Sequence, residues 1–488
     1  MDKGGPSGPL LFFRMSRMRI VVLIVCLGAA TAAQPVLVFD RHFTDRTMRV
    51  DYFHTGDVDT EILALDRVVG DGPWPGSRTR LLDDTNLGMY FFEVIDRATN
   101  RTLYSRGFAS IYGEWETTAE AKRTHRTFHA SLRFPWPKTQ VQVIVKKRDA
   151  ANAFREIWSA TVDPESRFVN RAEVAAGGRL WTVFENGPPA TKVDLLVLGD
   201  GYTEADLPKF HGDVKRLIGA LFATEPFRSR RADFNVRALD LPTAARGINR
   251  PQVGEFRRTP LGTQYNIFDS ERYVLTEDNR ALRDIASSAP YEFIEILVNE
   301  AHYGGGGIFN DQATAAVDTA FAEYVFIHEF GHHFAALADE YYTSDVAYET
   351  GGEKPEPWEP NVTALRDPSK LKWRDLVEAG IPLPTPWDKE AFEKRSREYQ
   401  ALRRKLRADR APETEMDKLF REQAARETKL LGSQKYSGKV GAFEGASYEA
   451  KGLYRPAIDC IMFTRNPVGF CPVCRRAIDR IVDMYARP

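Results

Sequence analysis

The stretch Asp318–Tyr341 reads DTAFAEYVFIHEFGHHFAALADEY and contains an HExxH motif at residues 328–332. On a helix, His328 and His332 are four residues apart and point from one face. Their ring nitrogens can then bind one Zn²⁺ ion, and Glu329 can reach the metal-bound water as a general base. The sequence therefore predicts a metal site with His328 and His332 as ligands and Glu329 as the catalytic residue.

The residues around the motif favour a buried helix. Asp318 and Thr319 offer N-cap chemistry, and residues 320–327 contain neither proline nor glycine and place apolar side chains all round a helix. Two histidines and a glutamate on such a helix need partners, because unpaired buried polar groups are costly. A zinc ion supplies a partner; a core helix with hydrogen-bonded histidines is the alternative. His333 points about 100° away from His332 and is expected to pack or to support the site.

The overall composition and the N-terminus favour a secreted protein. The chain has 488 residues and a formal net charge of −1, which predicts two or three domains and no nucleic-acid partner. Residues 1–33 have the pattern of a signal peptide, with Arg17 and Arg19 before an apolar run and small residues at 31–33. We expect a periplasmic or extracellular location, with membrane attachment only if this segment is an uncleaved anchor.

Residues 40–165 have the pattern of short strands. Residues 89–95 and 102–104 flank a turn-like segment and predict a hairpin. Apolar side chains alternate with polar ones at 128–134 and again at 141–145. We predict an N-terminal β-sandwich domain. A structural role is the simplest for it; a cover over the site, or binding of substrate or carbohydrate, are the alternatives.

From residue 170 the pattern changes to strands that alternate with helices, which predicts an α/β layered domain over residues 170–488. Expected strands lie at 193–198, 234–239 and 293–298, and expected helices at 203–222 and 280–286. Gly304–Gly307 follows the third strand. Four glycines suit either a mobile linker or an edge segment that pairs with an extended substrate.

Residues 388–432 are dense in charges of both signs and poor in large apolar side chains. This composition predicts an insertion of one or two solvated helices, broken near Ala411-Pro412. A charged surface pair is the simpler interpretation, and a lid or exosite over the cleft is the other.

Three cysteines remain once Cys26 is removed with the signal peptide: Cys460, Cys471 and Cys474. One disulfide and one free thiol are the simplest arrangement in an oxidising compartment. A structural zinc site would need a fourth ligand that the neighbouring sequence does not plainly offer. Met462 is either a methionine turn beneath the zinc or an ordinary core residue.

Several ordered segments resemble the IgA-peptidase family of zinc metallopeptidases, and the β region resembles that family's N-terminal domain. The resemblance implies a zincin-like α/β metallopeptidase domain, a Zn²⁺ cofactor and a protein or peptide substrate. It does not imply that IgA is the substrate. The segments that carry it are 193–202, 222–227, 303–310, 328–341, 440–445 and 454–474.

The third zinc ligand is predicted to be Asp339, because the resemblance retains the Asp-Glu-Tyr cluster at 339–341. On a continuous helix Asp339 would lie about 10 Å beyond His332, so the helix must end or bend near residues 337–338. Alanines at 335 and 336, where many zinc peptidases have a glycine, favour helix instead. Glu340 or a later residue is the next candidate, and Asp339 and Glu340 could also serve only to orient the histidines.

These residues predict a secreted zinc endopeptidase, in which Glu329 takes a proton from the zinc-bound water and returns it to the leaving amine. The alternative is a non-catalytic secreted binding protein with a structural zinc site and a partner-binding β-sandwich. Glu329 argues against that alternative, because a structural site needs no base and usually closes with four protein ligands.

Overall fold

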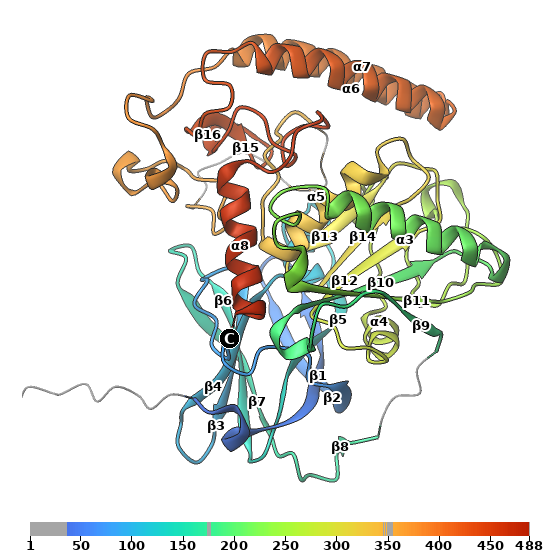
Figure 1. The fold of residues 1–488 in the computed structure, drawn as a ribbon, viewed down its shortest axis with the longest axis vertical. Helices are drawn as coiled ribbons and strands as arrows, with labels where there is room; N and C mark the ends of the chain where they lie inside the picture. Colours follow the sequence, from blue (N-terminus) through green and yellow to red (C-terminus); the bar gives the residue numbers. More distant parts are fainter. Residues whose placement is uncertain (1–36, 173–176, 345, 347, 349–354, 488) are drawn as a thin grey trace, which may run out of the picture. The chain divides into compact units, whose positions relative to one another are not determined.

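The N-terminal region is built from two four-stranded sheets in the computed structural model, which describes residues 37–172, 177–344, 346, 348 and 355–487 (Figure 1). The predicted signal peptide lies outside the described residues. One sheet has the order β5-β1-β2-β8 and the other the order β4-β3-β6-β7. The strands are β1 (Phe43–Gly56), β2 (Glu61–Pro73), β3 (Tyr90–Asp96), β4 (Thr102–Phe108), β5 (Arg126–Pro137), β6 (Val141–Arg148), β7 (Phe154–Val162) and β8 (Val169–Asn170).

The two sheets share one apolar core. Val50 and Tyr52 of β1 and Val94 of β3 belong to the same buried cluster, and Tyr52 stacks on Trp158 of β7. The alternating pattern that predicts these strands arises because successive side chains point to opposite faces. The β-rich region expected from residue 40 is thus confirmed, including the hairpin of β3 and β4. Two short helices, α1 (Phe39–His42) and α2 (Ile111–Trp115), flank the strands.

The second region contains a six-stranded sheet of order β13-β14-β12-β10-β11-β9. Its four inner strands are parallel, and the two edge strands are antiparallel to their neighbours. The inner strands are buried on both faces, which explains why their sequences are mostly apolar, with a few buried polar residues such as Asp194, Arg237 and Glu295. The strands are β9 (Arg179–Phe184), β10 (Val193–Asp200), β11 (Phe234–Asp240), β12 (Phe293–Val298), β13 (Gly305–Ile308) and β14 (Gln312–Ala316).

Helices cover both faces of this sheet. Leu195 and Val197 of β10 share a core with α3 (Leu207–Leu221) and α5 (Ala322–Ala335). Leu196 and Leu198 face the other way, toward α4 (Asn279–Ala286). The predicted alternation of strands and helices is therefore confirmed. Short 3₁₀ turns occupy 189–191, 204–206, 231–233, 251–253, 267–269, 368–370 and 374–376.

The C-terminal part adds a helix hairpin, a two-stranded sheet and a final helix. The charged segment forms α6 (Lys389–Ala408) and α7 (Glu413–Gly432), and their break falls at the expected Ala411-Pro412 (Figure 1). β15 (Phe443–Ala446) pairs with β16 (Glu449–Arg455). Helix α8 (Pro472–Ala486) packs against α5 and shares its core. In the described part of the chain, no helix combines the length and apolarity needed to cross a bilayer.

The β-rich region and the α/β region meet through buried charges. Arg49, fully buried on β1, pairs with Asp51 at 2.9 Å and with Asp71 at 2.6 Å, and it also contacts Asp284 of α4. Residues 37–488 form one compact unit. The boundary expected between residues 165 and 170 therefore stays a prediction.

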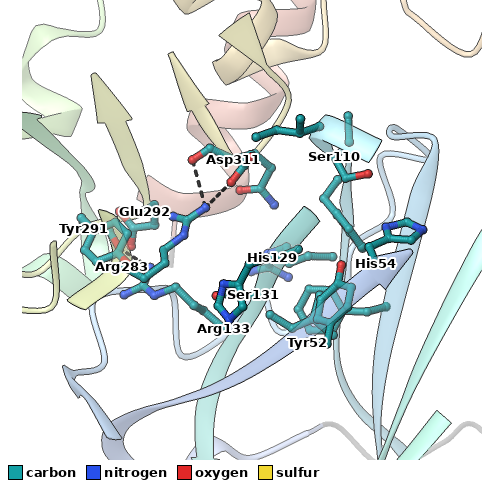
Figure 2. A pocket seen from close by; sticks show the side chains of 18 of the residues that line it. Tyr52, His54, Ser110, His129, Ser131, Arg133, Arg283, Tyr291, Glu292 and Asp311 are labelled. Carbon is teal, nitrogen blue, oxygen red and sulfur yellow. Dashed lines mark hydrogen bonds and ion pairs between the residues drawn. The ribbon is translucent and has the colours of Figure 1, made fainter. Parts of the chain in front are cut away.

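A small cavity of about 80 Å³ lies at this junction. Figure 2 shows His54 and Tyr52 from the β-rich region on one side and the Arg283–Asp311 pair on the other. His328, Glu329 and His332 do not line this cavity. It is therefore separate from the HExxH motif.

Candidate active site

Helix α5 carries the HExxH motif, but it begins later than its sequence suggests. The first helical residue is Ala322, and Phe321 is the N-cap without a side-chain cap. The expected cap at Asp318 and Thr319 is therefore wrong. Asp318 instead pairs with Lys209 at 2.8 Å, and Thr319 accepts the N–H of Phe321 through its hydroxyl at 3.2 Å.

Helix α5 ends at Ala335, because Ala336 adopts a left-handed conformation with φ of 55°. The N–H of Ala336 bonds the carbonyl of His332 at 3.0 Å, and the N–H of Leu337 bonds that of Gly331 at 3.3 Å. This pattern closes a helix that is usually ended by glycine. The expectation that alanines at 335 and 336 favour continued helix is wrong at Ala336, and the chain turns back so that Asp339 lies beside both histidines.

Three donor atoms meet at this turn. His328 Nε2 lies 3.0 Å from Asp339 Oδ1, His332 Nε2 lies 3.2 Å from the same oxygen, and the two Nε2 atoms are 3.1 Å apart. A tetrahedral zinc ion with bonds of about 2.0–2.1 Å holds its nitrogen and oxygen ligands about 3.3 Å from one another. The three separations therefore fit one metal ion, with a fourth position left for a non-protein ligand. We refer to His328, His332 and Asp339 as the donor triad.

Neighbouring groups fix the orientation of all three donors. His328 Nδ1 donates to the carbonyl of Ile461 at 2.9 Å, and His332 Nδ1 donates to that of Leu337. These bonds leave the Nε2 lone pairs free to bind a metal. The hydroxyl of Tyr448 donates to Asp339 Oδ2. No motif in the sequence points to Tyr448, which comes from the turn before β16.

Glu329 is half-buried and lines a cleft of about 600 Å³ together with His332 and Asp339. Burial raises the pKa of Glu329, although the nearby charges of His328 and His332 oppose the shift. A carboxylate in this place can exchange a proton with a molecule in the cleft.

The β-rich region contributes a second carboxylate to the same cleft. Glu114 of α2 lines it, and its Oε2 accepts hydrogen bonds from the hydroxyls of Tyr273 and, at 2.9 Å, Tyr348. Burial raises the pKa of Glu114 to about 7, against the hydrogen bonds of both tyrosines. No motif points to Glu114, because it lies more than two hundred positions from the HExxH motif in a region without a cluster of catalytic residue types.

Two of the four glycines allow β13 to lie close to α5. A Cβ atom on Gly307 would be 2.3 Å from the carbonyl oxygen of Glu329, and one on Gly305 would be 2.6 Å from Val325 Cγ1. β13 is an edge strand, as the edge hypothesis requires. At Gly305, however, the outer N–H and carbonyl are already bonded to Arg272 and Val274, both at 3.1 Å.

Of the three tyrosines considered from the sequence, Tyr341 lines the cleft, whereas Tyr342 and Tyr454 are not among its lining residues. The hydroxyl of Tyr341 accepts a hydrogen bond of 3.0 Å from Arg272 Nη2, and Arg272 lines the cleft as well. This pair can donate hydrogen bonds to negative charge that develops near the donor triad.

The remaining sequence expectations concern residues packed beneath α5. Met462 is fully buried, and its sulfur lies 3.0 Å from the place of a Cβ on Gly331. His333 packs, as expected, because its Nδ1 donates to Ile308 O at 2.9 Å and its Nε2 accepts from Ile294 N at 3.1 Å.

The expected disulfide is wrong, since Cys460, Cys471 and Cys474 are all unbridged and buried.

Comparison with known families agrees with this arrangement. A family model described as IgA Peptidase M64 matches residues 182–482, and one described as Peptidase M64 N-terminus matches residues 38–159. The chain belongs to the M64 peptidase family. Among curated proteins no match is found. The resemblance seen in the sequence is thus confirmed, and it makes this chain a peptidase. A metallopeptidase family implies a metal ion, and among the described residues His328, Glu329 and His332 form one of the groups able to hold one.

Proposed function

We propose that this M64 chain is a secreted zinc-dependent endopeptidase with Glu329 as its general base. The observation that carries the proposal is the convergence of His328 Nε2, His332 Nε2 and Asp339 Oδ1 within 3.0–3.2 Å of one another, at the wall of a cleft that Glu329 also lines. Two imidazoles and one carboxylate are a donor set that zinc accepts in hydrolases.

The proposed roles divide between the metal and the chain. Zinc, when bound, supplies a water of lowered pKa and polarises the scissile carbonyl. Glu329 accepts a proton from the attacking water and donates it to the leaving amine. The backbone carbonyls of Ile461 and Leu337 hold the rings of His328 and His332 with their Nε2 atoms toward the shared metal position.

Arg272 and Tyr341 are proposed to stabilise the tetrahedral transition state. Both line the cleft beside the donor triad, and they are already linked through the Tyr341 hydroxyl. Partial burial and the hydrogen bond between them hold this pair in one place, so that it needs little reorganisation when negative charge develops.

We propose that the substrate is an extended stretch of polypeptide. The cleft has a volume of about 600 Å³, and the edge strand β13 forms part of its wall through Gly305 and Gly307. In an antiparallel strand every second residue points its N–H and carbonyl the same way. Gly307 thus presents its peptide groups outward, as Gly305 does, and can pair with a bound peptide. The family name does not make IgA the substrate of this chain.

Export is proposed from the signal-like pattern of residues 1–33. N-terminal sequencing of the protein recovered from its native host tests this proposal. A mature terminus near Gln34 is expected, and a protein that retains Arg17 and Arg19 would contradict cleavage.

The substitution Glu329→Gln tests the enzymatic role. Zinc content should stay at the wild-type level, because Glu329 is not a proposed ligand, while hydrolysis of a protein mixture should fall by about 10²–10⁴-fold through loss of the general base. Metal analysis and mass spectrometry of cleavage products supply the two measurements.

Glu323→Gln is the matched control, since Glu323 lies on the same helix but is exposed. It should keep both zinc and activity. Equal hydrolysis by Glu329→Gln and wild type would exclude the proposed mechanism. Retained zinc with no hydrolysis by any variant would favour the binding-protein alternative.

A further inference from the structure

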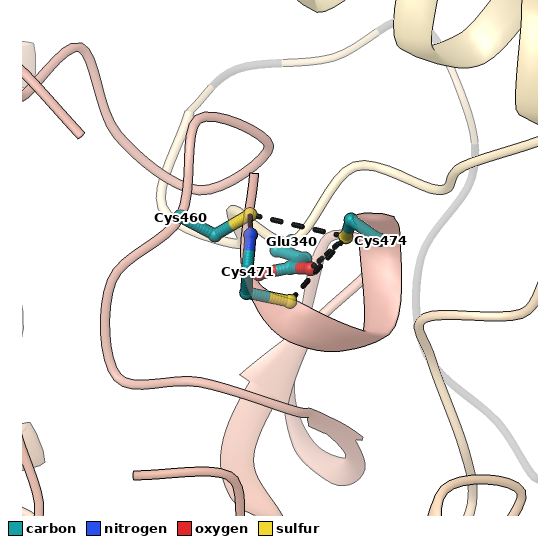
Figure 3. A group of neighbouring side chains, drawn as sticks. All are labelled: Glu340, Cys460, Cys471 and Cys474. Carbon is teal, nitrogen blue, oxygen red and sulfur yellow. Dashed lines mark hydrogen bonds between the residues drawn. The ribbon is translucent and has the colours of Figure 1, made fainter. Parts of the chain in front are cut away.

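A second group of metal-binding side chains lies next to the donor triad. Cys460, Cys471, Cys474 and Glu340 each present one atom to a common centre, with all four atoms within 4.8 Å of one another. Figure 3 shows the three sulfur atoms and the Glu340 carboxylate pointing toward each other. The sequence lacks a nearby fourth ligand for the cysteines, but the fold brings Glu340 to them from more than a hundred positions away.

The separations fit a tetrahedral ion. Cys474 Sγ lies 3.5 Å from Cys471 Sγ, 3.9 Å from Cys460 Sγ and 3.5 Å from Glu340 Oε1. Zinc bonds of about 2.3 Å to sulfur and about 2.0 Å to oxygen give tetrahedral S···S and S···O separations of about 3.8 and 3.5 Å. A disulfide requires sulfur atoms about 2.05 Å apart, and none of these pairs approaches that distance.

The burial of Glu340 gives an independent reason for an ion here. Its side chain is fully buried. Asn361 Nδ2 donates to Oε1 at 3.0 Å, but Oε2 has no hydrogen-bond partner. A buried carboxylate with an unpaired oxygen is costly unless a cation compensates it. The three thiols beside it carry no positive charge, and nearby Arg455 hydrogen-bonds three backbone carbonyls rather than Oε2.

We infer that these four side chains hold a structural zinc ion, distinct from the proposed catalytic one. Four protein ligands close the coordination shell, and the site is buried and does not line the cleft, as is typical of structural zinc. Sulfur-rich tetrahedral donor sets select zinc over harder ions such as magnesium or calcium.

Groups around the four side chains can offset negative charge on the sulfur ligands of a bound ion. The N–H of Cys471 donates to Cys460 Sγ at 3.3 Å. Cys471 is the N-cap of α8, and Cys474 lies in its first turn, where the helix dipole stabilises negative charge. Arg455 is fully buried nearby and attracts Glu340 and Cys460 electrostatically. These groups offset the net negative charge of three thiolates and a carboxylate around a divalent ion.

The ion would tie three segments of the catalytic region together. Glu340 directly follows Asp339, its N–H donates to Met462 O at 2.8 Å, and Met462 packs beneath α5. The loop at Cys460 and the start of α8 supply the other ligands. We infer that the structural zinc holds residues 338–340 in the turn that brings Asp339 to the histidines.

Metal stoichiometry of the mature full chain, purified without chelators from zinc-supplemented cells, tests the inference. Wild type and Glu329→Gln should each carry two zinc ions per chain. The double variant His328→Ala/His332→Ala should retain one ion, and Cys471→Ser/Cys474→Ser should lose the structural one. Ala477→Ser, at a buried position one turn further along α8, should keep both. One ion in wild type together with none in the histidine variant would overturn the inference without touching the proposed catalytic site.

Cobalt substitution covers the case in which the cysteine variant fails to fold. Cobalt bound by thiolates gives a sulfur-to-metal charge-transfer band in the near ultraviolet, whereas cobalt bound by imidazole and carboxylate does not. The His328→Ala/His332→Ala variant reconstituted with Co²⁺ should show this band. Absence of the band, or alkylation mapping that finds two of the three cysteines joined in a disulfide, would refute the site. If the protein shows no peptidase activity but the inferred zinc site exists, the metal stoichiometry, the cobalt band and the alkylation map should still give the expected results.

Discussion

Ala336 is the residue on which the catalytic geometry depends most directly. Its left-handed backbone ends α5 and turns Asp339 toward His328 and His332. An alanine in this conformation carries about 1–2 kcal/mol of strain. The sequence could not show it, because alanine is the strongest helix former and nothing local marks the break.

A comparison of Ala336→Gly with Ala335→Gly measures that strain. Both methyl groups are buried, so both substitutions lose similar packing, but only Ala336→Gly relieves a left-handed alanine. We expect it to lower the free energy of unfolding by about 1–2 kcal/mol less than Ala335→Gly does. Denaturant titration of both variants gives the difference. Equal losses would show that the turn is unstrained.

The residues of the donor triad were accessible from sequence, whereas the groups that support them were not. His328, Glu329 and His332 follow from helical spacing, and Asp339 follows from the family resemblance. Tyr448, Glu114 and Ile461 carry no motif, because their roles arise only when distant segments pack against α5. The sequence suggests Glu340 as a ligand of the catalytic metal or as a group that orients the histidines, yet its carboxylate lies with the cysteines.

At the scale of elements, the charged hairpin α6–α7 contacts the rest of the protein through several polar side chains, and one of them is Glu413, whose pKa is strongly lowered. Glu413, in the first turn of α7, accepts a hydrogen bond from His302 Nδ1 at 2.7 Å and pairs with Arg407. Burial disfavours the Glu413 anion, but His302 and Arg407 outweigh it and lower its pKa to about 2. Burial likewise opposes charge on His302, and its acidic neighbours Glu271 and Glu413 nevertheless raise its pKa.

The substitution Glu413→Gln should therefore destabilise the protein in a pH-dependent way. A lowered carboxylate pKa contributes stability that is present above the unfolded value of about 4.3 and is lost as the pH falls toward 2. The raised pKa of His302 adds stability that is present below its unfolded value of about 6.5 and is lost at higher pH. We expect the variant to lose about 2 kcal/mol near pH 5.5 and clearly less near pH 3, because the contribution of Glu413 shrinks as the pH falls from about 4 toward 2.

Glu415→Gln is the control for this measurement. Glu415 lies in the same first turn of α7 but is exposed, so the two substitutions change the interaction with the helix dipole alike. Urea titrations of the three proteins at both pH values make the comparison. A loss shared by both variants would assign the effect to the dipole rather than to the contact with His302.

Elements with strong periodicity were predictable, and short ones were not. Strands β10, β11 and β12, helices α3 and α4 and the α6–α7 pair all follow from apolar or charged patterns. β13 and β14 consist mainly of glycine and alanine, which have little strand preference of their own. In β13, Gly305 and Gly307 lie so close to α5 that a Cβ atom would not fit, and that requirement is tertiary.

At the scale of the whole molecule, the β-rich and α/β regions share apolar as well as charged contacts. Ile111, Tyr112 and Trp115 of α2 belong to one buried cluster with Phe268 and Leu275 of the α/β region. Together with the Arg49 ion pairs, this cluster buries side chains of both regions against one another. The two different sequence patterns suggest independent domains. The spacing of apolar residues within each region cannot show that side chains of the two regions pack against each other.

We therefore expect residues 37–488 to unfold in a single cooperative transition. Trp115→Ala, which empties a fully buried site in the shared cluster, should lower the free energy of unfolding by about 3–5 kcal/mol and shift the whole transition. Scanning calorimetry, with tryptophan fluorescence and catalytic activity followed in parallel, measures this. Two resolved transitions, with only the first moved by Trp115→Ala, would show that the regions are independent.

The order in which the site assembles follows from where its parts lie along the chain. The donors at 328–339 are close neighbours in sequence, so closing their loop costs little entropy. The groups that hold them and one wall of the cleft, however, come from residues 453–474 near the end of the chain. A newly made chain can consequently complete neither the turn at Asp339 nor the cleft before this last segment is added. Immature copies of this protein would then pose little danger to the polypeptides around them.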